Sequence, residues 1–392
     1  MTDAKVLICG ASIGGPALAY WLVRHGFDVT VVERAPGPRP GGQAVDVRGP
    51  ALDVAERMGV LAEIRAASTG MRGMSMVDAD GAEIFRSEEH TLSGGDLASP
   101  DVEVLRDDLA AILMRAAGGE VEYLFDDSPA AVEQDEHGVD VVFAGGGRRR
   151  FDLVVGADGL HSTTRRLVFG PESDFITHLG TYVGVWSAPN FLGLDRWQVF
   201  HQTPDGWGGG VLTARDNTEL RVYLGFESAT PLEYDHRDVA GQKRILAERL
   251  RNAGWVIPRL LEHMWDAPDF HFDSMAQIHM DSWSHGRVAL LGDAGYCGSP
   301  LSGQGTSMAM VGAYVLAGEL KAAGGDHHAA FAAYESELRG YVTANQELAL
   351  TNKRRVEAQQ AAEAGDTEAA AALAEGLADF TDVVGSFKPK DY

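Results

Sequence analysis

The first part of the chain constrains the fold more than any other feature of the sequence. An apolar run, KVLICG, leads into a glycine-rich turn, then into the segment PALAYWLVRHG and a second apolar run, DVTVVERA. Short apolar runs bounded by turn residues are typical of buried strands, whereas the middle segment has the apolar spacing of a helix. These residues predict a strand, a helix and a parallel strand, a unit of about 30 residues from which α/β folds are built.

The turn of this unit has the sequence GASIGG, residues 10–15. Gly10 suits a tight turn, a small second residue lets the backbone approach a pyrophosphate, and Gly15 lets the helix pack closely on the strand. Ser12 stands at the second position, where the strict pattern has glycine. Glu33 ends the second strand, where an acid can bind a ribose diol. The turn is therefore predicted to bind a dinucleotide; a glycine turn without a ligand and a surface role for Glu33 are the alternatives.

Two further glycine-rich segments follow predicted strands. GADGLHSTTRR, residues 156–166, follows one strand, and GDAGYCGSPLSGQG, residues 292–305, separates another strand from a helix-patterned segment. An Asp-Gly pair after a strand is often a simple turn, which is the alternative for the first of these segments. In the other, Asp293 is placed to bind a sugar or ribityl hydroxyl, and Gly303 and Gly305 begin a helix whose amides and dipole favour an electron-rich group. We expect all three segments to converge on one extended ligand.

In this order and at these separations, GASIGG with Glu33, GADGLHSTTR and GDAGYCGSPLSGQG resemble the three fingerprints of the single-component FAD-dependent aromatic hydroxylases. That family is the para-hydroxybenzoate hydroxylase-like flavoprotein monooxygenases, and the resemblance spans residues 4–350. The length of the chain, the loop GGQAVDVRG and the helical tail look especially similar to the tetracycline-inactivating monooxygenase branch. The resemblance implies FAD as the cofactor.

The resemblance also implies a reaction. NADPH or NADH would reduce FAD, O2 would form a flavin C4a-hydroperoxide, and its distal oxygen would hydroxylate an aromatic, phenolic or polycyclic substrate, such as a tetracycline- or polyketide-like molecule. No side chain is assigned a catalytic role, because the protein would orient the substrate and exclude water. The choice between NADPH and NADH stays open, since no second GxGxxG is visible. The alternatives are an FAD-dependent dehydrogenase or reductase of the same fold, without oxygen insertion, and a non-catalytic antibiotic-binding flavoprotein.

The resemblance assigns roles to individual residues. Arg106 matches an arginine that contacts FAD, Asp46 matches an acid of the flavin loop, and Arg39 matches an arginine assigned to NADPH. Gln198 and Arg221 fall in strands that would roof the substrate. The complete set expected at the cofactor is Gly10, Ser12, Ile13, Gly14, Gly15, Glu33, Arg34, Arg39, Gln43, Asp46, Arg106, Asp158, Gly292, Asp293, Pro300, Gly303 and Gly305.

Composition and charge argue against several other classes of function. The formal net charge of -24 disfavours nucleic acid or an anionic membrane as a partner, because phosphate groups would be repelled. No apolar stretch approaches the ~20 residues of a membrane span, and the start does not resemble a secretory signal. Cys9 and Cys297 are the only cysteines, and no HExxH motif occurs. We therefore expect a cytoplasmic enzyme without a metal, a monomer or weak dimer, whose partners are a small-molecule substrate and O2.

The expected fold class is α/β, with a Rossmann-like FAD-binding domain, a β-sheet substrate domain and a C-terminal helix. A chain of 392 residues is long enough for this organisation, and strand-like pieces between residues 176 and 283 carry most of the tryptophans. Residues 355–378, rich in alanine and glutamate, are predicted to form a solvated helix. The predicted parts are residues 1–175 with 284–325 for FAD, with part of 60–105 joining the substrate domain, residues 176–283 for the substrate, and 326–392 as a C-terminal helical segment.

Overall fold

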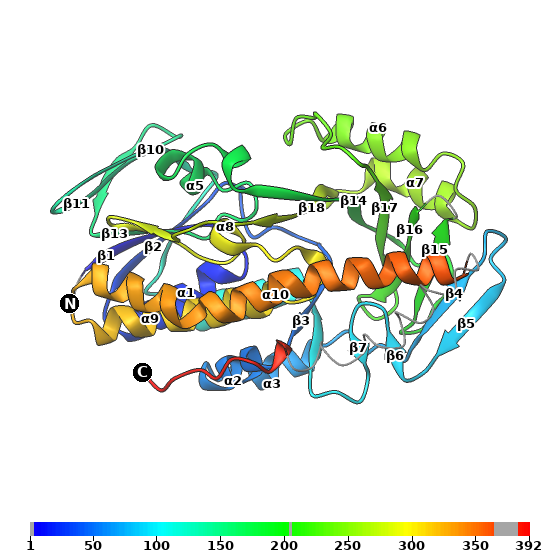
Figure 1. The fold of residues 1–392 in the computed structure, drawn as a ribbon, viewed down its shortest axis with the longest axis horizontal. Coiled ribbons are helices and arrows are strands. Elements are labelled where there is room, and N and C mark those ends of the chain that lie inside the picture. The colour runs from blue at the N-terminus through cyan, green and yellow to red at the C-terminus, as the bar shows by residue number, and fades with distance from the viewer. Residues whose placement is uncertain (1–3, 204–205, 364–382) are drawn as a thin grey trace.

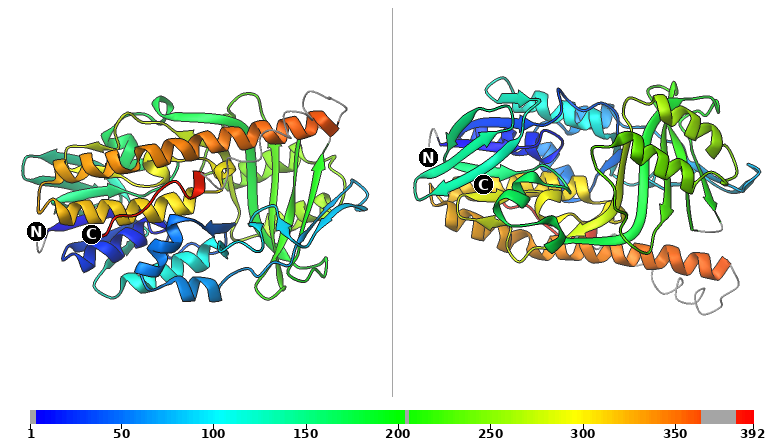
Figure 2. Two further views of the ribbon diagram at one scale, coloured as in Figure 1. Left: turned by 60° about the horizontal axis from the view of Figure 1, so that its bottom comes forward. Right: turned by 90° about the horizontal axis from the view of Figure 1, so that it is seen from above.

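The structure is a computed structural model that describes residues 4–203, 206–363 and 383–392. A six-stranded sheet and a seven-stranded sheet lie at opposite ends of the molecule, and helix α10 (His327–Glu363) runs alongside both (Figure 1). Figure 2 shows the same layout from two further directions. The helix predicted over residues 355–378 falls within α10 as far as Glu363, and residues 364–382 lie outside the described part of the chain.

The six-stranded sheet contains the predicted strand–helix–strand unit. β1 (Lys5–Cys9) and β2 (Asp28–Glu33) are parallel neighbours, and α1 (Gly14–Arg24) connects them. On its other side β1 pairs in parallel with β13 (Leu153–Gly156), which pairs in parallel with β20 (Val288–Leu290). The outer strands are β9 (Glu122–Phe125) and β19 (Ser284–His285).

Two layers cover this sheet. Val6 and Ile8 of β1 lie in a core shared with helices, whereas Leu7 and Cys9 lie in a core shared with a three-stranded sheet. Side chains alternate between the faces of a strand, and burial of both faces explains why KVLIC is almost continuously apolar. The expected α/β fold class is confirmed. The covering elements are α1, α4 (Arg106–Ala117) and α9 (Gly305–Ala322) on one face, and β10 (Pro129–Asp135), β11 (Gly138–Phe143) and β12 (Arg148–Phe151) on the other.

The seven-stranded sheet has one apolar and one polar face. Leu220, Val222 and Leu224 of β17 (Glu219–Glu227) are buried in a core with α6 (Val239–Arg249) and α7 (Ile257–Asp266). The opposite face carries polar side chains and is turned toward the first sheet's loops, as described below. The other strands are β18 (His271–Ile278), β14 (Ile176–Pro189), β16 (Gly206–Ala214), β15 (Gln198–Thr203), β4 (Met74–Val77) and β5 (Glu83–Ser87).

Short elements connect the two sheets. β3 (Ala44–Val47) pairs antiparallel with β8 (Val102–Leu105), and between them the chain leaves to form β4 and β5 of the seven-stranded sheet. The chain therefore crosses between the two sheets well before residue 176. The remaining short elements are α2 (Pro50–Arg57), α3 (Leu61–Ala66), β6 (His90–Thr91), β7 (Gly95–Asp96), α5 (Thr163–Val168), α8 (Asp293–Tyr296) and the 3-10 turns Glu172–Asp174 and Pro300–Ser302.

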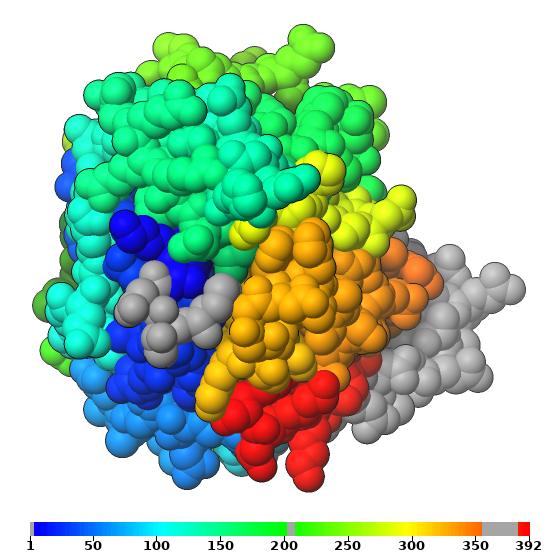
Figure 3. Space-filling model, turned by 90° about the vertical axis from the view of Figure 1, so that its left-hand side faces the viewer, coloured from blue at the N-terminus to red at the C-terminus, as the bar shows by residue number. Residues whose placement is uncertain are grey.

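The end of the chain returns to the six-stranded sheet's helices. Asp391 pairs with Arg57 at 2.6 Å, and the Tyr392 hydroxyl donates to Glu319 at 2.9 Å. Figure 3 shows these last residues, in red, against the yellow and orange helices. Residues 386–392 form no helix, because contacts with other elements fix them, so the predicted helical segment does not reach the end of the chain. None of the helices that the structure describes has both the length and the apolar character needed to cross a bilayer.

Candidate cofactor and substrate site

Four neighbouring strands of the six-stranded sheet end in the residues singled out from the sequence. β20, β13, β1 and β2 are adjacent and parallel, so their carboxyl ends lie at one edge of the sheet. GASIGG follows β1, GADGLHSTTRR begins at the end of β13, GDAGYCGSPLSGQG follows β20, and Glu33 ends β2 (Figure 1). We call this row of strand ends the glycine edge. It is the position at which open parallel sheets bind nucleotides.

The three glycine segments touch one another at this edge. Gly10 has φ +109° and donates its N–H to Val32 O at 2.7 Å, and a Cβ atom there would overlap the carbonyl oxygen of Ala157. A Cβ atom at Gly15 would overlap the carbonyl oxygen of Gly10. At Gly14 it would come within 3.3 Å of Leu291, the residue before the third segment. Glycine at positions 10 and 15 is therefore required by close backbone packing.

The turn after β1 is organised to receive an anion and a diol. Within the described residues no side chain caps α1 at Ile13, and its first turn contains no acid. Free amides at a helix N-terminus favour a phosphate group. Glu33 accepts a hydrogen bond from Ala11 N at 2.8 Å and another from Ala35 N at 2.9 Å, which holds its carboxylate beside the turn.

Arg106 joins this turn to the loop that contains Arg39 and Gln43. Its Nη2 atom donates to the carbonyl oxygens of Arg39 and Gly41, both at 2.7 Å, and its Nη1 atom lies 3.3 Å from Ser12 Oγ. Its backbone N–H donates to Gln43 O at 3.0 Å. Burial lowers the pKa of the Arg106 guanidinium to about 10. A buried cation at this place favours a phosphate-containing ligand between the turn and the loop.

Arg39 and Arg34 add positive charge beside the same turn. Both side chains are open to solvent. The pKa of Arg39 is lowered chiefly because nearby protein atoms displace water from the guanidinium; the charge of Glu33 opposes this effect and the charge of Arg34 adds to it. These two arginines therefore stand where a second phosphate-bearing molecule can reach them.

The third glycine segment brings Asp293 to the start of a long helix. Gly292 and Gly303 have φ +62° and +64°, values that glycine adopts without strain. Asp293 Oδ1 lies 3.9 Å from the Cβ position of Gly305, the first residue of α9. The Asp293 side chain and Pro300 are open to solvent, and enclosure by protein raises the pKa of the Asp293 carboxyl group. Asp293 therefore lies beside the start of α9 and is open to solvent.

Gln304 is a buried polar residue of the third glycine segment. Its side chain is fully buried, and neither its Nε2 nor its Oε1 atom has a hydrogen-bond partner among the described residues. Buried amides are almost always paired, so this group needs a ligand or water to satisfy it. Its place between Gly303 and Gly305 in the segment was the only sequence feature that could have drawn attention to it.

The loop after β3 closes over the third segment. Asp46 pairs with Arg48 at 2.8 Å, and both side chains are buried. Arg48 N donates to Ser307 Oγ at 3.1 Å, and Arg48 Nη1 lies 3.6 Å from the Cβ position of Gly303. Burial raises the pKa of Asp46 to about 8, and the nearby charge of Glu103 adds to this effect, which the Arg48 cation only partly offsets. Asp46 thus lies next to the third segment.

Asp158, in the second segment, is engaged within its own turn. Its carboxylate accepts hydrogen bonds from Thr164 N at 2.9 Å, from Thr164 Oγ1 at 3.0 Å and from Ser162 Oγ. These contacts hold the start of α5 and fix the turn against Gly10, whose Cβ position is 3.0 Å from Asp158 Cα. Asp158 therefore shapes the glycine edge, and its carboxylate oxygens already have partners.

The polar face of the seven-stranded sheet carries the two predicted substrate residues in one row. Cross-strand register aligns Gln198, Leu212, Arg221 and Ser187, so their side chains share a face. Arg221 is buried and donates to Glu219 at 2.7 Å and to Ser187 Oγ. Gln198 is also buried.

A tyrosine fixes the distance between this face and the cofactor loop. Tyr223 lies two residues after Arg221 on β17 and therefore points to the same side of the sheet. Its hydroxyl accepts a hydrogen bond from Ala44 N at 2.7 Å. The strand alternation around Arg221 could have identified Tyr223 from the sequence. We call the surface formed by Gln198, Leu212, Arg221, Ser187 and Tyr223 the polar sheet face. It faces the loop that bears Gln43 and Asp46.

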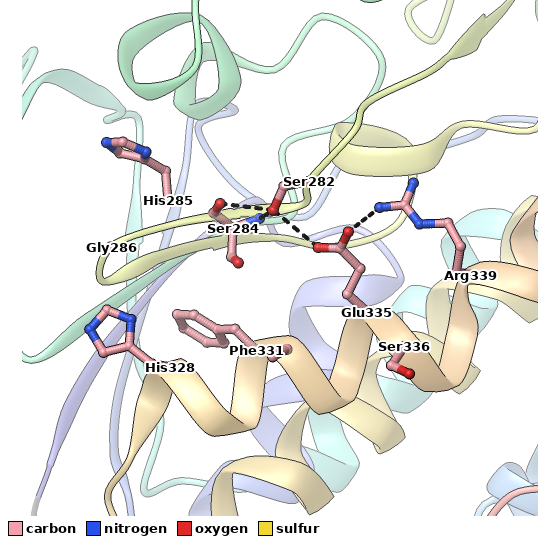
Figure 4. A pocket seen from close by; sticks show the side chains of 10 residues that line it. Ser282, Ser284, His285, Gly286, His328, Phe331, Glu335, Ser336 and Arg339 are labelled. Carbon is pink, nitrogen blue, oxygen red and sulfur yellow. Dashed lines mark hydrogen bonds and ion pairs between the residues drawn. The ribbon is translucent and has the colours of Figure 1, made fainter.

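A separate surface cavity of about 560 Å³ lies between α10 and the β19–β20 turn (Figure 4). Its Glu335 is already bound by Ser282 Oγ at 3.1 Å, Trp283 N at 3.0 Å and Arg339. None of the residues predicted for cofactor or substrate lines it. The cavity is lined by Ser282, Ser284, His285, Gly286, His328, Phe331, Ala332, Glu335, Ser336 and Arg339.

A parallel sheet with three glycine segments at its strand ends, facing the polar side of a second sheet, defines a dinucleotide-binding flavoprotein class. Residues 3–349 match a family described as FAD binding domain. An uncharacterised protein of Mycobacterium tuberculosis (strain ATCC 25618 / H37Rv) is 56% identical over 347 residues, which cover 88% of this chain and 93% of that protein. A flavin-dependent monooxygenase from an unknown prokaryotic organism is 44% identical over 342 residues, 87% of each chain.

The fold comparison agrees with the sequence comparison. The crystal structure of the tetracycline destructase Tet(51) matches with a TM-score of 0.86 and 36% identity, covering 100% of both chains. The chain therefore belongs to the FAD-binding-domain family of flavin-dependent monooxygenases and is an FAD-dependent oxidoreductase. The resemblance inferred from the three glycine segments is confirmed.

Proposed function

We propose that this chain is a monooxygenase that uses FAD, NADPH or NADH, and O2 to hydroxylate an aromatic, phenolic or polycyclic substrate of tetracycline or polyketide type. The observation that carries the proposal is the Tyr223–Ala44 hydrogen bond, which holds the polar sheet face against the cofactor loop. A substrate on that face would lie beside the flavin. The relatives support this reading, because they include a flavin-dependent monooxygenase and a tetracycline destructase.

We assign the glycine edge to FAD. The amides at the start of α1 and Arg106 bind the pyrophosphate, Glu33 binds the adenosine ribose, and Asp293 binds a ribityl hydroxyl. The amides at the start of α9 stabilise negative charge on the flavin's polar edge. Bound FAD supplies the redox chemistry with O2, and the chain orients the reactants and excludes water. The residues assigned to the two nucleotides, with Arg34 and Arg39 for the nicotinamide nucleotide and the others for FAD, are Gly10, Ser12, Ile13, Gly14, Gly15, Glu33, Arg34, Arg39, Gln43, Asp46, Arg106, Asp158, Gly292, Asp293, Pro300, Gly303 and Gly305.

The polar sheet face is assigned to the substrate. The Arg221 guanidinium is held by Glu219, so it presents a fixed cation to an enolate or phenolate oxygen. Gln198 lies in the same row, and its amide, which contacts Ser93, would exchange that contact for the substrate. A polycyclic enol would be bound by both residues and kept beside the flavin. We accordingly assign residues 1–175 and 284–325 to an FAD domain, without β4 and β5, and residues 176–283 with those two strands to a substrate domain.

The nicotinamide nucleotide is assigned to the solvent-open side of the cofactor loop. Arg39 and Arg34 offer two cations there, and a 2′-phosphate would gain from both. We therefore favour NADPH over NADH. Replacing Arg39 with Gln should raise the KM for NADPH about tenfold or more and leave the KM for NADH nearly unchanged, as expected for loss of one charge-assisted contact. Equal effects on both nucleotides would contradict this assignment.

The decisive experiment is stopped-flow reduction of the FAD-loaded protein by NADPH and by NADH, with phenols, anthracyclines or tetracyclines, followed by mass spectrometry of products formed under 18-O2. A compound that accelerates flavin reduction and gains one labelled oxygen atom would establish the proposed reaction. Acceleration with an unlabelled product would identify a dehydrogenase or reductase. A flavin-loaded protein that no reductant reduces would identify a non-catalytic flavoprotein.

We further propose that the enzyme acts in the reducing cytoplasm as a monomer or weak dimer. Both cysteines, Cys9 and Cys297, are buried free thiols, a state that a reducing compartment preserves. Light scattering coupled to size exclusion across a concentration series would test the oligomeric state. A stable dimer at the lowest concentration would contradict it.

A further inference from the structure

Three side chains with metal-binding chemistry meet between the two sheets, away from the assigned roles. His161 lies within the second glycine segment, His236 precedes α6, and Asp273 lies on β18. One nitrogen or oxygen atom from each lies within 4.8 Å of the others. His161 Nε2 is 3.0 Å from Asp273 Oδ1, and the ring centroids of His161 and His236 are 3.9 Å apart.

His161 is held in the orientation that metal-binding histidines adopt. Its Nδ1 atom lies 2.9 Å from Glu172 Oε1, and Glu172 Oε2 accepts a hydrogen bond from the buried Arg165 at 2.9 Å. In metal sites the non-ligating nitrogen of a histidine is usually bound by a carboxylate, which fixes the tautomer and directs the other nitrogen to the ion. Glu172 does this here, since it leaves Nε2 of His161 directed toward Asp273.

Access and remaining coordination positions also suit an ion. His236 is exposed, whereas His161 and Asp273 are half-buried, so an ion can arrive from solvent and be partly enclosed. The Tyr234 ring lies 4.6 Å from the His236 ring, and the Tyr234 hydroxyl interacts with the Asp273 carboxyl group. A fourth ligand, water or this hydroxyl, would complete a tetrahedron.

The geometry points to a site for a divalent transition-metal ion, with Zn²⁺ the best match, ligated by His161 Nε2, a ring nitrogen of His236 and the Asp273 carboxylate. Two imidazoles and one carboxylate suit Zn²⁺ and neighbouring ions, whereas Mg²⁺ prefers oxygen ligands alone. The proton shared between His161 and Asp273 leaves as the ion binds. The ion links the second glycine segment to β18 and to the segment before α6, and so connects the six-stranded sheet to the seven-stranded sheet.

The test uses the full-length, FAD-loaded protein after treatment with a chelator and desalting. Co²⁺ serves as the spectroscopic probe, Zn²⁺ as its competitor and Mg²⁺ as the oxygen-preferring control. We expect Co²⁺ to give visible bands beyond the flavin absorption at one ion per chain, and Zn²⁺ to abolish them. Saturating Zn²⁺ should raise the Tm by about 2 °C or more, because only the folded chain assembles the site. Mg²⁺ should change neither quantity.

Variants separate this site from chance histidine binding. His236→Ala should weaken Co²⁺ binding at least tenfold while FAD loading stays at the wild-type level. Glu172→Gln should weaken it about 10- to 100-fold, because the charge that orients His161 is lost. His137→Ala, which removes an exposed histidine of the β10–β11 turn, is the matched control and should bind Co²⁺ as the wild type does.

Two outcomes would overturn the proposal. One is a wild-type protein that shows no Co²⁺ bands and no Tm change with Zn²⁺, in which case His161 serves only as an ion-pair partner of Asp273 and Glu172. The other is a His236→Ala protein that binds Co²⁺ with wild-type affinity. Neither readout depends on turnover, so the result is independent of the proposed monooxygenase activity.

Discussion

The glycine edge and the polar sheet face form one site by different physical means. Close backbone packing forms the edge, since Cβ atoms at Gly10 and Gly15 would overlap neighbouring carbonyl oxygens. Side chains form the face, because cross-strand register aligns Gln198 with Arg221. Gly10 and Gly15 therefore accept no larger residue, whereas residues of the face can be changed one at a time.

Gly15→Ala should disrupt the glycine edge more than any other change proposed here. The added Cβ atom would overlap the Gly10 carbonyl oxygen inside a turn that cannot widen without separating α1 from β1. We expect a loss of about 3 kcal/mol or more in unfolding free energy and no retained flavin. Flavin absorbance after dialysis and a thermal melt would measure both. Gly37→Ala is the control, since a Cβ atom there meets nothing within 4 Å; wild-type behaviour of Gly15→Ala would contradict the comparison.

Asp46, between edge and face, gives a pH-dependent test. Its folded carboxyl group has a pKa of about 8, whereas an unfolded aspartate has about 4. Between these values the folded chain holds the extra proton, so raising the pH lowers stability, by about 1.4 kcal/mol per unit, until the loss is complete above about 8.

Asp46→Asn removes this titration. From about pH 6 to pH 8 the wild-type unfolding free energy should fall by about 2 to 3 kcal/mol relative to the variant. Denaturant melts across this range would measure the difference. Asp80→Asn, at an exposed turn, is the control and should follow the wild type. Parallel profiles for Asp46→Asn and the wild type would show that the Asp46 carboxyl group is already ionised at pH 6.

Asp293→Ala tests a side chain at the backbone-built edge. Loss of a charged acceptor for a ribityl hydroxyl should cost about 1.5 to 3 kcal/mol, which raises the Kd for FAD roughly 10- to 150-fold. Titration of the apoprotein with FAD, followed by flavin fluorescence, would measure the change. Asp293→Asn should lose less, because the amide oxygen still accepts a hydrogen bond. Unchanged FAD affinity in Asp293→Ala would remove this residue from the cofactor site.

Arg221→Met tests the face alone. Loss of the guanidinium should raise the substrate KM about tenfold, because one charge-assisted hydrogen bond to an enolate or phenolate is lost. The Kd for FAD should stay within about twofold of wild type. Partial unfolding would change both the substrate KM and the Kd for FAD, so it cannot produce this result. Arg244→Met, which removes an exposed arginine of α6, is the control and should leave both quantities unchanged. If FAD affinity and substrate KM changed together, the division between edge and face would be wrong.

Ser12→Gly should have the smallest effect. It removes only the 3.3 Å contact with Arg106 and restores the strict glycine pattern. We expect the Kd for FAD to change by less than about threefold, since a long hydrogen bond between a guanidinium and a neutral hydroxyl contributes under about 1 kcal/mol. The same FAD titration would measure it. A tenfold loss would show that Ser12 binds the cofactor through its hydroxyl group.

Local sequence patterns predicted the parts of the molecule that local physics determines. The strand–helix–strand unit and the order of the glycine segments depend on residues that are neighbours in the chain, and both are present as expected. Tyr223 contacts Ala44 across 179 positions, and no local pattern records such a pairing. The end of the helical tail was missed for a similar reason, because Arg57 and Glu319 fix the last residues from distant elements.

The strands of the seven-stranded sheet come from residues 74–87, 176–227 and 271–278, and those of the six-stranded sheet surround these stretches on both sides. Neither half of the molecule is contiguous in the gene. A crossover that replaced residues 176–278 would exchange β14 to β18 and leave β4 and β5 of the same sheet behind, so β15 would have to pair with a strand of different origin. Single replacements on the polar sheet face leave this pairing intact.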